Sequence, residues 1–211
     1  MAWDCACGSG QASQTLASYF DLVVATDASP VQVASAPAIE KTRFVVAASE
    51  RVPLADGAVD LVTVAQALHW FVGETFFAEV KRVVRPGGVF AAWTYGMPYV
   101  ESEAVERAVH CFIDGILGSY WPEEIRLVLD GYASINLPFS ELETPAFELQ
   151  VDWTLARFLG FVRTWSAVGR YRDERGDDPL VQLAAELESL WVDETELLPI
   201  SWRLDLRAGR L

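Results

Sequence analysis

Residues 4–10 read Asp4-Cys5-Ala6-Cys7-Gly8-Ser9-Gly10, and they follow a short apolar run that predicts a buried strand from Ala2 to Ala6. A helical pattern begins directly after Gly10. Because glycine lets the backbone approach a ligand closely, this strand, turn and helix indicate a ligand-binding loop. A tight strand-to-helix turn also needs glycine, so the glycine pattern taken alone leaves a purely structural role equally open.

The first half of the chain alternates short apolar runs with amphipathic segments, which is typical of a parallel sheet with crossover helices. We expect further strands at Leu22–Thr26, Phe44–Ala47, Val59–Ala65 and Val89–Tyr95. Helices should begin after Gly10, near Pro30 and around Glu74, and Arg85-Pro86-Gly87-Gly88 should end the last of them with a turn. Right-handed crossovers place helices on both faces of such a sheet. The sequence therefore predicts an α/β fold with a doubly wound, Rossmann-like, mostly parallel sheet.

The second half has a different pattern. Apolar residues fall at helical spacing over 105–117 and 155–165. Residues 147–151 and 200–206 alternate apolar with polar, and we expect these two strands to pair antiparallel at one edge of the sheet. The turn-rich span 136–145 is the best candidate for a boundary between two parts of the chain.

Composition and charge narrow the class of protein. A chain of 211 residues, 52% hydrophobic with 8 Trp, predicts a folded domain with a well-buried core. Sixteen basic against 30 acidic residues give a net charge of -14, so we expect neither a nucleic acid nor a membrane as partner. With no signal peptide or membrane-spanning run, the chain is expected to be cytoplasmic.

The three cysteines lack the spacing of a zinc site or of a disulfide framework, which predicts reduced thiols. Cys5 and Cys7 stand two apart on the first predicted strand and should point to the same face. Without further ligands nearby, they are interpreted as small buried side chains and no metal is expected.

Asp27 stands near the end of the second predicted strand, seventeen residues after Gly10. This is close to the spacing at which an acidic residue binds ribose hydroxyls in nucleotide-binding folds. The alternative is that Asp27 caps the helix that begins near Pro30, a position that Ser29 could fill instead.

Several further stretches stand in a familiar order. They are Thr26-Asp27-Ala28-Ser29, Ala48-Ser49-Glu50-Arg51-Val52-Pro53-Leu54, Asp60-Leu61-Val62, Gln66-Ala67-Leu68-His69-Trp70 and Arg85-Pro86-Gly87-Gly88. With the glycine loop before them, they resemble the class I S-adenosylmethionine-dependent methyltransferases, in particular the small-molecule (methyltransferase type 11) group that includes trans-aconitate methyltransferase-like proteins. The resemblance covers nearly the whole chain and implies S-adenosylmethionine as cofactor and a small molecule as substrate.

The resemblance also implies a cofactor site. Asp4 and the turn from Gly8 to Gly10 would hold the methionyl end, and Asp27 would hold the ribose. Ala28 would flank the adenine, the backbone of Ala48 and Ser49 would face its edge, and Gln66 would lie beside the sulfonium. A nicotinamide enzyme would usually carry a third glycine where this chain has Ala12.

The acceptor and the catalytic residues are less defined. His69 follows the fourth predicted strand and is the candidate general base if the acceptor is a hydroxyl or a carbon acid; otherwise it is a structural hydrogen-bonding residue. A carboxylate acceptor is ionised at pH 7 and needs no base. Trp70 either walls the pocket, where it could make a cation–π contact, or packs in the core.

A helical insertion over about 100–118, together with residues 163–166, should form a lid that selects the substrate. On it, Trp165 is a candidate pocket residue, and Arg163 could pair with a substrate carboxylate or be a surface arginine. We expect a single domain over 1–211, with the cofactor-binding half at 1–96 and the lid insertion and C-terminal edge strands at 97–211.

Two departures from the family pattern affect the expected activity. Ala6 occupies the first glycine position of the loop, which alanine tolerates where φ stays negative. Relatives carry a helical segment before the first strand, whereas only two residues precede Trp3 here. We therefore expect a trimmed start, a more open site, or a partner subunit, such as a second copy in a homodimer, that covers the site. Besides methyl transfer, the alternatives are a cofactor-binding protein without turnover and a non-methylating enzyme of the same fold.

Overall fold

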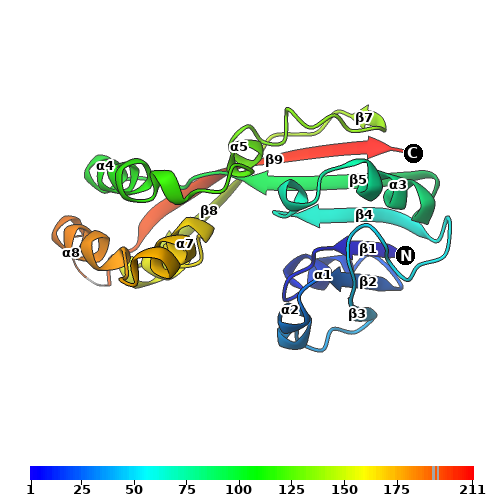
Figure 1. Cartoon of the computed structure of the whole chain (residues 1–211), viewed down its shortest axis with the longest axis horizontal. Helices are drawn as coiled ribbons and strands as arrows, with labels where there is room; N and C mark the ends of the chain where they lie inside the picture. Colours follow the sequence, from blue (N-terminus) through cyan, green and yellow to red (C-terminus); the bar gives the residue numbers. More distant parts are fainter. Residues whose placement is uncertain (192, 194) are drawn as a thin grey trace. The chain divides into compact units, whose positions relative to one another are not determined.

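The computed structural model describes residues 1–191, 193 and 195–211 and divides the chain into two compact units. Unit 1 comprises Met1–Tyr95, Leu127–Phe147 and Leu204–Leu211, and unit 2 comprises Gly96–Arg126 and Glu148–Arg203. Residues 127–147 and 204–211, which belong to the half predicted to hold the lid insertion and the C-terminal edge strands, pack within unit 1 (Figure 1).

Unit 1 is built on a mostly parallel sheet flanked by helices, as predicted. Its parallel strands are β1 (Ala2–Cys5), β2 (Val23–Asp27), β3 (Thr42–Val46), β4 (Val59–Ala65) and β5 (Val84–Tyr95), in the order β3-β2-β1-β4-β5. The second half of β9 (Leu198–Arg210) pairs antiparallel with β5, and β7 (Ser140–Leu142) pairs with β9. The strand order changes direction between β1 and β4, and such a switch point is where open α/β sheets form their ligand crevice.

The helices of this unit begin close to the predicted positions. They are α1 (Gln11–Leu16), α2 (Pro30–Ser35), the 3₁₀ turn η1 (Leu68–Trp70) and α3 (Glu74–Val83). The last three residues of α5 (Ile125–Leu129) also belong to unit 1. Pro30 at the first helical position and Ser29 as the N-cap explain why α2 begins where it does.

Apolar strands that are buried on both faces form the core of unit 1, as expected for parallel strands. Trp3, Val23 and Val62 are completely buried, and the indole N–H of Trp3 donates to the Thr26 hydroxyl at 2.8 Å. Phe76 of α3 packs edge-on against Trp3 and Phe90, which fastens α3 to the sheet.

The stretch from Arg85 to Gly88 corrects one expectation. α3 does end before it, at Val83, but the residues do not form a turn ahead of the strand, because β5 already begins at Val84. The register passes from Val59↔Val84 to Leu61↔Val89, so these residues are a bulge opposite Asp60. A Cβ on Gly88 would lie 3.0 Å from the Asp60 carbonyl oxygen, and Gly87 has φ +81, so both glycines serve the bulge.

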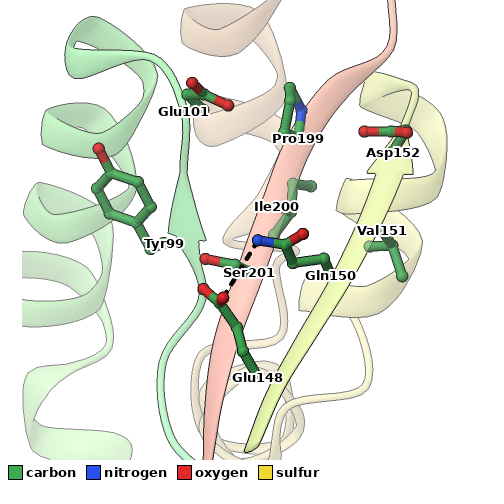
Figure 2. Close-up of a pocket in the computed structure, with 9 residues that line it drawn as sticks. All are labelled: Tyr99, Glu101, Glu148, Gln150, Val151, Asp152, Pro199, Ile200 and Ser201. Carbon is green, nitrogen blue, oxygen red and sulfur yellow. Dashed lines mark hydrogen bonds between the residues drawn. The ribbon is translucent and has the colours of Figure 1, made fainter.

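Unit 2 is mainly helical, as the apolar spacing predicted. Its helices are α4 (Glu103–Cys111), the π-helical turn η2 (Phe112–Ile116), η3 (Gly118–Tyr120), α6 (Leu155–Val162), α7 (Ser166–Arg175) and α8 (Leu180–Leu190). The short strand β6 (Tyr99–Val100) pairs antiparallel with the first half of β9, and β8 (Phe147–Trp153) pairs with β9 as well. Figure 2 shows β8 running opposite to β9, which confirms the predicted antiparallel pair.

Among the residues that the structure describes, no helix is both long enough and apolar enough to span a membrane.

Candidate functional site

A cavity of about 570 Å³ lies in unit 1 at the carboxyl ends of β1, β2 and β4. The lining residues come from the ends of β1, β2, β3 and β4 and from the helical segments α1, α2 and η1: Asp4, Ala6, Cys7, Gly8, Gln11, Ala12, Asp27, Ala28, Ser29, Gln32, Ala47, Ser49, Ala65, Gln66, Ala67, Trp70 and Phe71. This is the crevice that the strand order predicts for a ligand.

The loop after β1 turns the chain through three left-handed residues. Ala6, Gly8 and Gly10 have φ of +55, +55 and +92. A Cβ on Gly10 would lie 2.7 Å from Cζ of Phe44, so Gly10 is required by both conformation and space. Because φ at Ala6 is positive, the condition under which alanine is tolerated there is not met, and this residue is strained by roughly 1–2 kcal/mol. The loop thus keeps its glycine conformation at a position where the glycine is replaced by alanine.

The same turn separates the two N-terminal cysteines. β1 ends at Cys5, and the left-handed Ala6 comes before Cys7, so the two thiols are not on one strand face as expected. Both are buried, and burial raises the pKa of the Cys7 thiol to about 12, which keeps it neutral. Among the residues that the structure describes, no group of three or more His, Cys, Asp or Glu is placed to hold a metal ion.

Asp4 is completely buried at the floor of the loop. Its carboxylate accepts hydrogen bonds from the hydroxyls of Ser13 at 2.5 Å and Thr63 at 3.0 Å, which link β1 to α1 and β4. Burial raises the pKa of Asp4, and the two hydroxyl groups partly oppose that shift. A carboxylate in this environment favours a cationic group of a ligand beside it.

Asp27 fastens the loop from the neighbouring strand. One carboxylate oxygen accepts from the backbone N–H of Gly8 at 2.9 Å, and the other accepts from that of Ser29 at 2.8 Å. Each oxygen has a second acceptor position left for a ligand hydroxyl. The helix-capping alternative is decided in favour of Ser29, whose hydroxyl accepts from the N–H of Gln32.

Gln66 follows β4 in a left-handed conformation, with φ +52. Its amide oxygen accepts from the Thr94 hydroxyl at 2.7 Å and from the Tyr95 N–H at 2.9 Å, and its amide nitrogen donates to the Tyr95 carbonyl at 3.0 Å. The side chain is thus hydrogen-bonded to the end of β5. Gln66 lines the cavity as predicted, but these bonds engage its amide within the protein.

The structure brings most of the other predicted cofactor residues to the cavity. Gly8, Ala28 and Ser49 line it, but Ala47 does so in place of Ala48, and Gly10 serves as the N-cap of α1. Sequence reasoning missed Cys7, Gln11, Ala12, Ser29, Gln32, Ala47, Ala65, Ala67 and Phe71 as lining residues. Their signal was position alone, since each lies within a few residues of a predicted strand end or helix start.

Trp70 lines the cavity with about half of its side chain exposed, whereas His69 is buried behind the wall. The His69 Nδ1 lies 2.9 Å from the hydroxyl of Tyr132, and its ring lies 4.7 Å from that of Trp70. These contacts are those of a hydrogen-bonding structural residue. A role for His69 as the base stays a prediction.

Arg163 and Trp165 belong to unit 2, and their partners lie in that unit as well. Arg163 forms an ion pair with Asp178 at 2.7 Å, and the Trp165 ring packs against Trp121 and Phe161. Their assignment to a substrate pocket stays a prediction.

Unit 2 has a cavity of its own, of about 660 Å³, between β6, β8 and β9 (Figure 2). It is lined by Tyr99, Glu101, Glu148, Gln150, Val151, Asp152, Pro199, Ile200 and Ser201. Gln150 donates to Glu148 at 3.2 Å. The described lining of this cavity contains no histidine, cysteine or lysine.

The charge of the unit 1 cavity fits S-adenosylmethionine. Its lining contains two carboxylates, Asp4 and Asp27, and no lysine, arginine or histidine. This set suits a ligand with a sulfonium, an ammonium and a ribose diol, and it offers no basic side chain to the two phosphates of a dinucleotide.

Comparison with known proteins identifies the family of the chain. The family model described as a methyltransferase domain matches residues 3–92. A methyltransferase of Dictyostelium discoideum is 30% identical over 189 residues, which cover 89% of this chain and 72% of the relative. The malonyl-[acyl-carrier protein] O-methyltransferase of a Marinomonas species is 30% identical over 122 residues, which cover 53% of this chain and 45% of that protein.

A solved structure, that of a type II methyltransferase from Anaeromyxobacter dehalogenans, is 41% identical. The match covers 99% of this chain and 88% of that one, with a TM-score of 0.89. With the glycine loop, Asp27 and the switch-point cavity in place, the chain belongs to the class I S-adenosylmethionine-dependent methyltransferases.

Proposed function

We propose that this methyltransferase methylates a carboxylate oxygen of a small molecule. The observation that carries the proposal is the absence of a suitable base among the described residues of the cavity lining. The set contains no histidine, lysine or tyrosine, and the Cys7 thiol, with a pKa of about 12, is neutral. The carboxylates of Asp4 and Asp27 are held by hydrogen bonds from within the protein.

A carboxylic acid is ionised at pH 7 and presents a nucleophilic oxygen without help, whereas an alcohol or a carbon acid must lose a proton to a base. S-adenosylmethionine, when bound, supplies a methyl group activated by its positively charged sulfur. The residues of this chain then have the tasks of binding and orientation, which can provide most of the rate enhancement. Asp4 and Asp27 would hold the polar groups of the cofactor, and Trp70 and Phe71 would supply apolar contacts from the same cavity.

Two further observations support a small carboxylate. The Marinomonas relative is named for O-methylation of a malonyl group, which carries a free carboxylate when it is linked to its carrier. The net charge of -14 opposes the binding of nucleic acids and anionic membranes, which favours an acceptor of another class.

The test uses S-adenosylmethionine with a radioactive methyl group and a panel of small carboxylic acids, each matched with the corresponding alcohol. Methyl esters release volatile methanol in mild base, whereas ethers and carbon-linked methyl groups do not. Base-labile label with the acids supports the proposal. Base-stable label with the alcohols contradicts it and returns His69 to the role of base. Tight cofactor binding with no transfer to any member of the panel favours the cofactor-binding protein without turnover.

The cofactor site itself is tested at Asp27. Substitution Asp27→Ala removes the anchors of Gly8 and Ser29 together with the acceptor for the ribose, and should abolish cofactor binding in calorimetry. Asp27→Asn keeps one acceptor and should weaken binding about 10- to 100-fold, as expected for losing a charged hydrogen bond. The exposed Asp21→Asn serves as the control, with unchanged affinity. Full affinity in Asp27→Ala would place the ribose elsewhere.

A further inference from the structure

The hydroxyl of Tyr132 lies at the centre of a buried polar cluster behind the cavity wall. Tyr132 is completely buried in unit 1, and its hydroxyl lies 2.9 Å from the Nδ1 of His69, 63 residues earlier in the chain. Burial raises the pKa of Tyr132 to about 12, opposed by the Thr94 hydroxyl and by the backbone of Leu68 and His69. The hydroxyl is therefore neutral and can donate one hydrogen bond while it accepts others.

This cluster is continuous with the residues that line the cofactor cavity. The Thr94 hydroxyl donates to the amide oxygen of Gln66, and that oxygen also accepts from the Tyr95 N–H. Gln66 is strained by its positive φ, so it keeps that conformation only because surrounding contacts hold it. Gln66, Ala67 and Trp70 line the cavity, and the cluster thus fixes residues 66–70 from behind.

Tyr132 is itself held in an unfavourable conformation. Its φ is +62, which is rare for a bulky aromatic residue. The turn before it is packed tightly, because a Cβ on Gly131 would lie 2.6 Å from the Cγ of Asp205. Arg207 donates to the Tyr132 carbonyl and also binds Glu141 at 2.8 Å. A strained residue that β9 holds in place from its backbone side is consistent with a functional task for its side chain.

We propose that Tyr132 is a positioning residue of the methyltransferase site, whose hydroxyl holds His69 and Thr94, and through Thr94 holds Gln66, so that residues 66–70 keep the conformation that lines the cofactor cavity. The inference rests on the cavity being the cofactor site. Tyr132 does not line the cavity, and it acts on the cofactor only through the residues it holds.

The first test is Tyr132→Phe, which removes the hydroxyl and keeps the ring. The dissociation constant of S-adenosylmethionine, measured by calorimetry, should rise about tenfold, because a buried polar group is left without its partner. Tyr19→Phe removes the same hydroxyl from an exposed side chain of unit 1 and should leave the constant unchanged. Val80→Ala, in the buried face of α3, lowers the melting temperature without touching the cluster, and it should also leave the constant unchanged.

Unaltered affinity in Tyr132→Phe overturns the proposal, as does a tenfold loss in Val80→Ala, because general destabilisation would then explain both. If the wild-type protein does not bind S-adenosylmethionine or its demethylated product, the cofactor site itself fails, and the proposal fails with it. The two failures are distinguishable because only the second affects the wild type.

A double-mutant cycle tests whether Tyr132 acts through Thr94. Thr94→Val keeps the shape of the side chain and removes its hydroxyl. If the two residues act as one unit, Tyr132→Phe should cost less than a further twofold in the Thr94→Val background. Fully additive tenfold losses would overturn the coupling.

At His69, asparagine retains a polar group at the position of Nδ1 and glutamine retains one at the position of Nε2. His69→Asn should therefore keep near-normal affinity, and His69→Gln should lose about as much as Tyr132→Phe. Equal losses in both variants would contradict the role of the Nδ1 contact.

Discussion

At the scale of single residues, the cavity that we propose as the cofactor site contains groups that are poor choices for stability. Asp4 is a buried carboxylate, and Ala6 and Gln66 have positive φ. Such features cluster at functional sites because binding requires them and the surrounding structure tolerates their cost. Substitutions that relieve the cost should therefore separate stability from cofactor binding.

Asp4→Asn should make the protein more stable at pH 7 by about 1 kcal/mol while it weakens cofactor binding about tenfold. Burial raises the folded-state pKa of Asp4 above its ordinary value of 3.8. The stabilisation that this residue provides is thus complete below that value and is lost as the pH rises through the raised pKa. Chemical denaturation between pH 4 and 8 should show that dependence in the wild type and lack it in Asp4→Asn. Lower stability of the variant at pH 7 would show that the two hydroxyl bonds outweigh burial.

Ala6→Gly should also stabilise the protein, but unlike Asp4→Asn it should strengthen cofactor binding. It removes roughly 1–2 kcal/mol of backbone strain and adds about 0.5–1 kcal/mol of unfolded-chain entropy, so a small net gain in stability is expected. Cofactor affinity should also rise, because Ala6 lines the cavity and its methyl group is removed. Thermal unfolding and calorimetry measure the two effects. Gly8→Ala is the reverse control, because it introduces the same backbone strain at φ +55. It should lose about as much stability as Ala6→Gly gains, since the new Cβ lies no closer than 3.8 Å to another atom and adds no clash.

At the scale of secondary structure, Glu79 and Arg82 of α3 hold the segment that follows β3. Glu79 accepts from the Val52 N–H at 2.7 Å, and Arg82 donates to the carbonyls of Leu54 and Val52. Ser49 lies in the same segment and lines the cavity, so Glu79 and Arg82 anchor a segment that contributes to the cavity wall.

Glu79→Gln should lower the free energy of unfolding by about 1–3 kcal/mol at pH 7, because the hydrogen bonds lost involve charged groups. Arg82 lowers the pKa of Glu79 below its ordinary value of 4.5. Its stabilising effect is therefore present above that value and is lost as the pH falls through the lowered pKa, and the variant should lose this acid sensitivity. Glu103→Gln removes an exposed ion pair with Arg107 on α4 and should change stability by less than about 0.5 kcal/mol. An equal loss in both variants would contradict a special role for the buried pair.

The elements that the sequence predicted well are those with strong local signals. Buried parallel strands are short apolar runs, and β4 was predicted with its exact bounds. The start of β5 was missed because the proline and glycines of a bulge are also the residues of a turn. Asp27 lies at the cavity as predicted, because its place at the end of β2 follows from its spacing after the glycine loop. Ala48 was predicted where Ala47 lines the cavity. The regular alternation of side chains stops at the end of a strand, so the sequence does not indicate which of the two residues faces the cavity.

The residues behind the site were beyond sequence reasoning for a different reason. The bonds of Gln66 with Thr94 and Tyr95, and the contact of His69 with Tyr132, depend on chain segments that meet only in the folded protein. Nothing near Tyr132 in the sequence indicates a partner 63 residues earlier.

At the scale of the whole molecule, the cofactor cavity is built from residues of unit 1 alone. A ligand at 100 times its dissociation constant stabilises the folded state by about 2.7 kcal/mol. Hydrogen exchange with saturating S-adenosylmethionine should therefore slow in peptides from residues 1–95, and α8 of unit 2 serves as the internal reference. Equal protection of α8 would contradict a site confined to unit 1.

The pairing of β5 with β9 also affects how the protein is made. Leu204–Arg210 supply the antiparallel partner of Val89–Tyr95, so β5 has no neighbour on that side while a nascent chain is shorter than these residues. An unpaired apolar edge is a template for intermolecular strand addition. Unit 1 can complete its sheet only after the ribosome has translated β9, and until then this edge of β5 stays open to pairing with another chain.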